Sequence, residues 1–225
     1  MTDATVPGVV SPGSGASSVA EPAAADAAPV GRVQRKRDRR IRQILTAAAE
    51  LVGERGYEAV SLEEVAERLD VTKGSLYHYF SGKDALVTAA IETLGDDWTA
   101  RLEGLPAGRE GTAERRLRAL LGEHVRIAVR EYPAALRLFL VPSTWPADQR
   151  TRIKELRRRH DAVFRAVLNE GVAGGEFSVV SVDATLQCLH ASMSQAPEWV
   201  GGLRRAEQER VLDDLVETLM KLVAR

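Results

Sequence analysis

The sequence predicts an all-α protein with a three-helix helix-turn-helix domain followed by a larger helical domain. Beyond residue 31, apolar side chains recur three and four residues apart in one segment after another, which is the period of an amphipathic helix. The same segments lack the alternation of apolar and polar residues that marks a half-buried strand. Hydrophobic residues make up 44% of the 225 residues, so the chain can bury a sizeable core.

The first 31 residues differ in composition from the rest and are predicted to be a disordered tail. They are mainly Ala, Pro, Gly, Ser and Val without a period, and cannot bury enough surface to offset the entropy of ordering. A basic run over residues 32–40 leads into a first helix over residues 37–55, which Gly56 ends as a left-handed cap. The buried side of that helix consists of Ile41, Ile44, Leu45, Ala48, Leu51 and Val52.

Residues 62–83 have the pattern of two short helices joined by a tight turn. Ser61 is placed to cap the first helix, and Glu64 three residues later completes a capping box. After the turn, Thr72 caps the second helix. The inner face of the second helix is set by ring and apolar side chains at i, i+3 and i+4, namely Leu76, Tyr79 and Phe80.

The outer face of the second helix carries residue types that contact DNA. Two hydroxyls, one cation, two rings and a glycine face outward, namely Thr72, Lys73, Gly74, Ser75, Tyr77 and His78. Such side chains bind phosphates or reach base edges in the major groove. Residues 32–83 also carry eleven basic and eight acidic residues, whereas the whole chain has a net charge of −1. The alternative is an ordinary solvated helix.

The same residues resemble the tetracycline-repressor (TetR) family of bacterial transcription regulators. The run TKGSLYHYF, residues 72–80, matches the family's recognition helix nearly letter for letter. Gly56-Tyr57 before it and Lys83 after it also fit the family pattern, and the resemblance is dense over residues 41–86. A bare helix-turn-helix pattern is weak evidence, but this run with its flanking residues is specific.

The resemblance implies a domain organisation and a set of partners. Residues 32–85 would bind double-stranded operator DNA, and residues 86–225 would form a ligand-binding and dimerisation domain. Two copies would form a homodimer that reads two half-sites. Further DNA contacts would come from the helix that crosses the backbone, the fourth-helix start and the basic run, through Ser61, Lys83, Arg35 and Arg39. The basic run could instead be only a solvated arm.

The remaining two thirds of the chain are predicted to be helical. Helices are expected over residues 83–102, 112–132, 134–141, 147–170, 182–196 and 206–223. The apolar stripe of the last helix fits a bundle with a symmetry mate and fits packing within one chain equally well. Cys188, the one cysteine, lies in an apolar helix and is expected to be a small core residue.

No motif for catalysis or metal binding is present in the sequence. The four His residues form neither HExxH nor a Cys/His cluster, and GxSxG and phosphate-binding glycine loops are missing. An enzyme, a cofactor and a metal are therefore not expected.

The second domain is expected to sense a small molecule through ring and polar side chains on apolar helices. The candidates are His124, Tyr132, Phe139, Trp145, His160, Phe164, His190 and Met193. Singly each of them fits core packing, but together they could line a mostly apolar pocket. Residues 166–177 resemble an actinobacterial TetR subgroup, some of whose members respond to acyl-CoA thioesters. The Arg-rich segment over residues 150–165 could meet CoA phosphates or could be a solvated face.

These observations predict a ligand-responsive transcriptional repressor, released from its operator by a small, largely apolar effector, with an acyl-CoA as one candidate. The alternative is a constitutive or architectural DNA-binding dimer whose second domain only dimerises. No apolar run approaches the length of a membrane span, and neither a signal peptide nor a disulfide framework is recognisable, so a cytoplasmic protein is expected.

Overall fold

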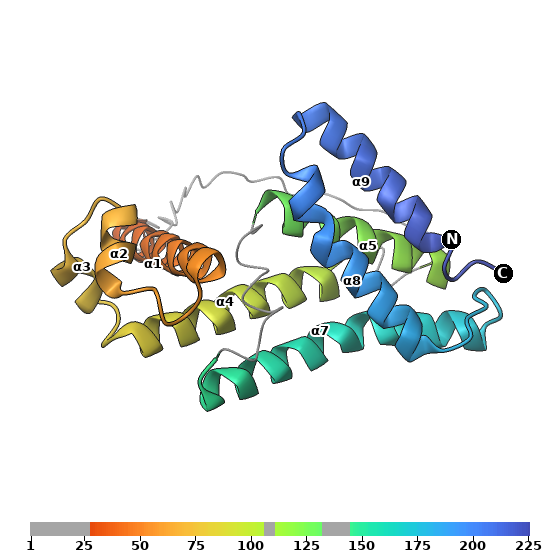
Figure 1. Ribbon diagram of the computed structural model, residues 1–225, viewed down its shortest axis with the longest axis horizontal. Coiled ribbons are helices and arrows are strands. Elements are labelled where there is room, and N and C mark those ends of the chain that lie inside the picture. The colour runs from red at the N-terminus through yellow and green to blue at the C-terminus, as the bar shows by residue number, and fades with distance from the viewer. Residues whose placement is uncertain (1–27, 106–110, 132–144) are drawn as a thin grey trace, which may run out of the picture. The chain divides into compact units, whose positions relative to one another are not determined.

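Residues 28–105, 111–131 and 145–225 are described by the computed structural model in Figure 1. Within these ranges there are eight helices and no strand, which confirms the all-α prediction. The predicted helix over residues 134–141 and all but the last residues of the predicted tail fall outside them. No helix in the described ranges is long and apolar enough to cross a membrane.

The chain divides into two units, Met1–Arg37 and Asp38–Arg225. Of the first unit only the beginning of α1 (Ala28–Arg55) is described. That helix starts at Ala28 and not near residue 37, so the basic run is helical throughout. The prediction of a later start is wrong because it took the first apolar stripe as the helix start, whereas charged residues also have good helix propensity.

In the second unit, the end of α1 packs with α2 (Leu62–Arg68) and α3 (Lys73–Tyr77) around a small apolar core. Gly56 ends α1 with φ of 85°, as the sequence predicts. The capping box of α2 is formed, because Ser61 Oγ accepts from the Glu64 amide and the Glu64 carboxylate accepts from the Ser61 amide at 2.8 Å. Caps of this kind satisfy amides that have no partner within the helix.

Two long helices take part in both cores of this unit. The first half of α4 (Lys83–Glu103) contributes Leu86 to Leu94 to the helix-turn-helix core, and its second half contributes Trp98 and Leu102 to the other core. α7 (Ala147–Ala173) does the same with Ile153 at one end and Phe164 at the other. Figure 1 shows α4 and α7 running side by side.

α5 (Ala113–Arg130) is the central helix of the second core, packed against α7, α8 (Val182–Val200) and α9 (Arg205–Met220). α8 continues through Pro197 to Val200, although the sequence predicts an interruption there. The proline lies in the last turn, where one missing amide is tolerated by the remaining contacts. Cys188 is exposed on α8, which corrects its expected burial, since it lies on the side of α8 that faces away from the core.

Candidate functional site

The outer face of α3 is accessible, as a DNA-reading helix requires. Thr72, Lys73, Ser75, Tyr77 and His78 are all exposed, and Tyr77 keeps 48% of its surface. Leu76, by contrast, is fully buried and anchors the helix to its core.

The α3 cap is formed as predicted and it orients two hydroxyls. Thr72 Oγ1 accepts from the Ser75 amide at 3.4 Å and lies 3.2 Å from Ser75 Oγ. Gly74 leaves open space beside them, because an added Cβ would meet nothing closer than Thr72 Oγ1 at 4.0 Å. The first turn of α3 therefore presents an exposed polar surface with room for close approach at Gly74.

Both lysines of the predicted interface make contacts within the protein. Lys73 forms an ion pair with Glu63 of α2, and its Nζ lies 5.5 Å from the centroid of the Tyr77 ring. Lys83 Nζ donates to the Tyr57 carbonyl oxygen at 3.0 Å and lies 4.3 Å from the centre of the Tyr57 ring. Lys83 is therefore a structural link between α4 and the loop after α1, in addition to any contact with phosphate.

The other predicted DNA contacts either lie on α1, apart from α3, or already form a hydrogen bond within the protein. Ser61 is half-buried, and its hydroxyl is the cap acceptor of α2. Arg39 is exposed on α1 and makes no ion pair with any residue that the structure describes. Arg35 belongs to the other unit, is exposed, and lies near Gly31 of its own helix.

A pocket of about 100 Å³ lies in the second core, between α4, α5, α7 and α8. Three of the four His residues line it, one from each of α5, α7 and α8. Their ring centroids are 5.0 Å apart for His124–His160, 5.4 Å for His160–His190 and 6.0 Å for His124–His190. The Trp98 ring of α4 packs against His124 at 5.0 Å. Sequence positions 124, 160 and 190 thus form one cluster in space.

Two rings of the cluster, those of His124 and His160, are held in their uncharged form. Burial, and then the neighbouring imidazoles, keep the pKa of His124 well below its ordinary value. Burial lowers the pKa of His160 to about 3. His190 Nε2 lies 3.1 Å from an Asp161 carboxylate oxygen, and this contact lowers the pKa of Asp161. In the described part of the chain, no group of three His, Cys, Asp or Glu side chains is arranged to hold a metal ion.

The other predicted ligand residues do not line this pocket or lie outside the described residues. Phe164 is fully buried and packs against the rings of His124, His160 and His190, and Met193 is buried in the same core, but neither lines the pocket. Tyr132 and Phe139 lie outside the described residues. 

Trp145 lies elsewhere, which corrects its assignment to the ligand pocket. It is 4% exposed in the helix-turn-helix core, and its ring lies 5.3 Å from that of Tyr57. A tryptophan between two prolines gives no indication in the sequence of which core it joins.

Several residues that line the pocket were not predicted from the sequence. For some of them the sequence pattern could have indicated the position, and for others it could not. Gln187 and Ser194 lie three residues before and four residues after His190, so the three side chains share one face of α8, and Gln187 is exposed at the edge of the pocket. Arg157 and Asp161 line the same pocket from α7. These two are indistinguishable in sequence from the many other charges of that helix.

Comparison with known proteins agrees with this architecture. Residues 44–90 match the model for "Bacterial regulatory proteins, tetR family", and residues 110–223 match that for "Tetracyclin repressor-like, C-terminal domain". The second match alone covers half of the chain. The first match covers most residues of the helix-turn-helix core, and the second match covers most residues of the second core.

Individual relatives show the same pattern. The transcriptional regulator RutR of Escherichia coli K12 is 36% identical over 99 residues, 43% of this chain and 44% of RutR, so the match spans less than half of that relative. The transcriptional repressor KstR2 of Rhodococcus jostii is 25% identical over 166 residues, 70% of this chain and 78% of KstR2. The structure of the regulator FadR from Bacillus subtilis in complex with stearoyl-CoA has a TM-score of 0.63 at 20% identity, covering 80% of this chain and 97% of FadR. On the family matches and the fold, this chain belongs to the TetR family of bacterial transcription regulators.

Proposed function

We propose that this regulator is a homodimeric repressor that leaves its operator when a small, largely apolar molecule enters the pocket of the second domain. The observation that carries the proposal is the pocket itself, where buried ring nitrogens of His124 and His160 have no hydrogen-bond partner among the described residues. A domain that served only for dimerisation would be packed solid at this place, because protein interiors leave few voids larger than water. The constitutive, architectural alternative lacks such support.

The pocket is in a position to act on the DNA-binding domain. It is lined by Gly95, Trp98 and Thr99 of α4, and by Leu156 and His160 of α7, among others. Both helices continue into the helix-turn-helix core. A ligand that separates or twists α4 against α7 would therefore move one core relative to the other.

Polar contacts link α4 to α7 along the way. Gln149 Nε2 donates to Thr88 Oγ1 at 3.3 Å, Arg152 pairs with Glu92 at 3.1 Å, and Arg159 pairs with Asp96 at 2.7 Å. We expect the two helices to move together near the helix-turn-helix core. A ligand would favour the conformer it binds better, and repression would end if that conformer spaced the recognition helices wrongly for adjacent major grooves.

The size of the pocket bears on the acyl-CoA hypothesis. A cavity that admits benzene measures about 150 Å³, and the one here is about 100 Å³. The enclosed part takes only a short group in this conformation, and a longer chain would have to pass out beside the exposed Arg157 and Gln187, so we propose a small effector in preference to a long-chain acyl-CoA. On α7, Arg152, Arg159 and Arg165 are already paired with carboxylates.

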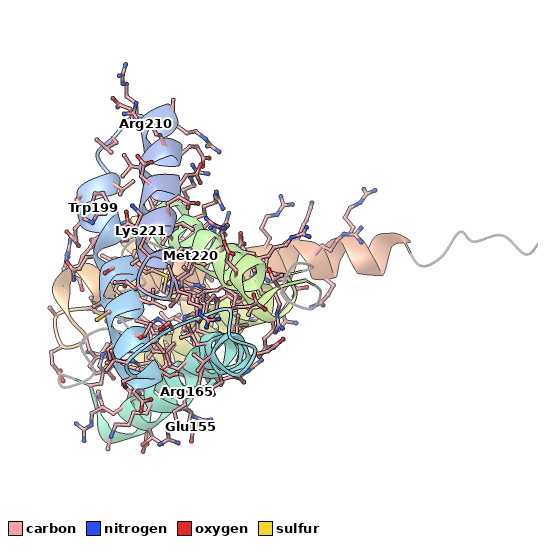
Figure 2. The ribbon with its side chains drawn as sticks, turned by 90° about the vertical axis from the view of Figure 1, so that its right-hand side faces the viewer. Glu155, Arg165, Trp199, Arg210, Met220 and Lys221 are labelled. Carbon is pink, nitrogen blue, oxygen red and sulfur yellow. The ribbon has the colours of Figure 1, made fainter. Side chains whose placement is uncertain are left out.

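Dimerisation is proposed to use the exposed side of α8. Most of the apolar stripe of α9 packs against other helices of the same chain, since Leu212, Val216 and Leu219 are buried. On α8 a row of mostly small residues at helical spacing remains exposed, namely Ala184, Cys188, Ala191 and Gln195, and ends at Trp199, which is 50% exposed. Figure 2 labels Trp199 near the end of α8, beside the α9 end that carries Arg210. Small residues allow two helices to approach closely, and a ring can anchor such an interface.

The test starts from DNA that the protein selects from a random pool. We expect selective, salt-sensitive binding to a two-fold symmetric site and release by a small apolar compound found by screening. The variant Ser194→Leu, which fills the pocket, should keep operator binding and lose the response, whereas Thr151→Leu on the exposed side of α7 should keep both. Binding of the selected DNA that no compound changes, together with Ser194→Leu behaving as wild type, would favour the constitutive alternative.

A further inference from the structure

The deep end of the pocket has a chemistry that restricts what can bind there. His124 is 3% exposed, and neither of its ring nitrogens has a hydrogen-bond partner among the described residues. His160 Nε2 is likewise buried without a partner there. A buried polar atom left unpaired costs about 1–3 kcal/mol. Trp98 Nε1, which lines the same pocket, is also buried without a partner among the described residues, and four such atoms beside one pocket indicate that something polar fills it.

The protonation state defines the complementary group. Both rings are neutral, because burial lowers the pKa of His124 and of His160. A neutral imidazole has one N–H donor and one acceptor nitrogen. The partner must therefore both accept and donate hydrogen bonds, as a hydroxyl or a primary amide does and as a carboxylate or an ester does not.

The surrounding charges do not favour an anion. Arg157 and Asp161 both line the pocket, so one positive and one negative side chain offset each other there. Trp98 and Leu156 give the pocket apolar walls near the rings, and its other side chains, those of Thr99, Gln187 and Ser194, are polar but uncharged. Moving a carboxylate into such surroundings without a paired cation is costly. The apolar walls instead suit the compact body of a small molecule.

We propose that the pocket recognises a short, uncharged group that both donates and accepts hydrogen bonds, carried on a compact apolar body, with His124 and His160 as its anchors. This inference rests on the proposed function and narrows its effector class. It places the hydrogen-bonding head between α5 and α7 and the apolar body against Trp98 of α4. Ordered water is the rival occupant, since the cavity is polar enough to hold it.

The test uses three probes of nearly equal size, namely isobutyramide, isobutanol and isobutyrate. Binding to full-length protein is followed by the ¹⁵N signals of the imidazole rings at neutral pH. Isobutyramide and isobutanol should shift the signals of His124 and His160, and should leave those of His78, exposed on the far side of the helix-turn-helix domain, unchanged. Isobutyrate should bind at least ~10-fold more weakly, because its charge would be buried without a partner.

Two ring variants complete the design. His124→Phe keeps the ring and removes both nitrogens. It should abolish the shift that isobutyramide causes in the remaining imidazole ¹⁵N signals of the pocket, and His160→Phe should do the same. His78→Phe should leave that shift unchanged. Isobutyrate binding as well as the amide, or no probe shifting any ring, would overturn the inference, and the latter would assign the cavity to water. Selected operator DNA is titrated with the wild-type protein and with the two pocket variants, but not with His78→Phe, because His78 lies on the expected DNA-binding face. Intact operator binding without probe binding overturns the pocket chemistry alone, whereas failure to bind operator overturns the proposed function.

Discussion

Acidification should destabilise this protein through its buried histidines well before its carboxylates titrate. In the folded state the pKa of His160 is about 3, and in the unfolded chain it returns to about 6.5. Between these two values the unfolded state binds a proton that the folded state does not. Stability that is fully present above about pH 6.5 is therefore lost progressively as the pH falls.

The magnitude follows from the two pKa values. At about pH 5, the pH lies about 1.5 units below the unfolded pKa, and each unit corresponds to about 1.36 kcal/mol. His160 alone should thus lower the free energy of unfolding by about 2 kcal/mol relative to about pH 7.5. His124, whose pKa is also well below its ordinary value, should add a loss in the same direction. Asp161 does not oppose this, because its pKa is lowered and it stays ionised at pH 5.

Urea unfolding at both pH values, at one fixed protein concentration, measures the effect. His160→Phe should reduce the pH-dependent loss by about 2 kcal/mol, whatever its effect on stability at neutral pH. Thr151→Leu, which changes an exposed side chain of α7 and removes no titratable group, is the control and should leave the pH dependence of the wild type unchanged. If His160→Phe and wild type lose the same amount between the two pH values, the ring is not held neutral and the description of the pocket is wrong.

Four further outcomes concern the DNA-binding surface and the dimer. Lys83→Ala should lower the melting temperature as well as DNA affinity, because it removes the contacts with the Tyr57 carbonyl and ring; an unchanged melting temperature with a reduced salt slope would leave phosphate binding as its only role. Gly74→Ala should not destabilise the fold, since a Cβ has room, so any loss of operator affinity reports close approach of DNA; unaltered affinity would remove Gly74 from the interface. Trp199→Glu should convert the dimer to monomer in light scattering at micromolar concentration, and a persistent dimer would exclude the α8 face. His78→Ala should cost more affinity for the selected operator than for random DNA, on the order of 1–3 kcal/mol, and equal losses would mean that it does not read bases.

The helix-turn-helix domain could be predicted nearly residue by residue because its signals are local. The caps at Ser61 and Thr72 and the stop at Gly56 depend only on a few neighbouring residues, and the structure has all three. The buried face of α3 follows from the position of Leu76 in the helical period. The interface itself remains a prediction, since exposure of the outer face shows only that it is available.

The pocket could be predicted in part. The sequence shows which residue types are present, but it does not show which of them lie close together in the fold. His124, His160 and His190 are unusual on apolar helices, which selects them from sequence. Their convergence depends on how α5, α7 and α8 pack, and this is set by contacts between residues far apart in the chain. The same limit explains Trp145, whose partner Tyr57 lies in another domain of the sequence.

The division of the chain into two domains by sequence also hides how the domains are coupled. A boundary drawn at residue 85 assigns α4 to the second domain, yet Leu86 to Leu94 belong to the helix-turn-helix core. α7 crosses the boundary in the same way, because Ile153 packs in the first core and Phe164 in the second. The second domain of the sequence thus contains a helix, α7, that helps to form the core on which the recognition helix packs. Under the proposed function, a ligand beside His160 would act on the same helix that carries Ile153, so the proposed route from pocket to DNA needs no link beyond α4 and α7 themselves.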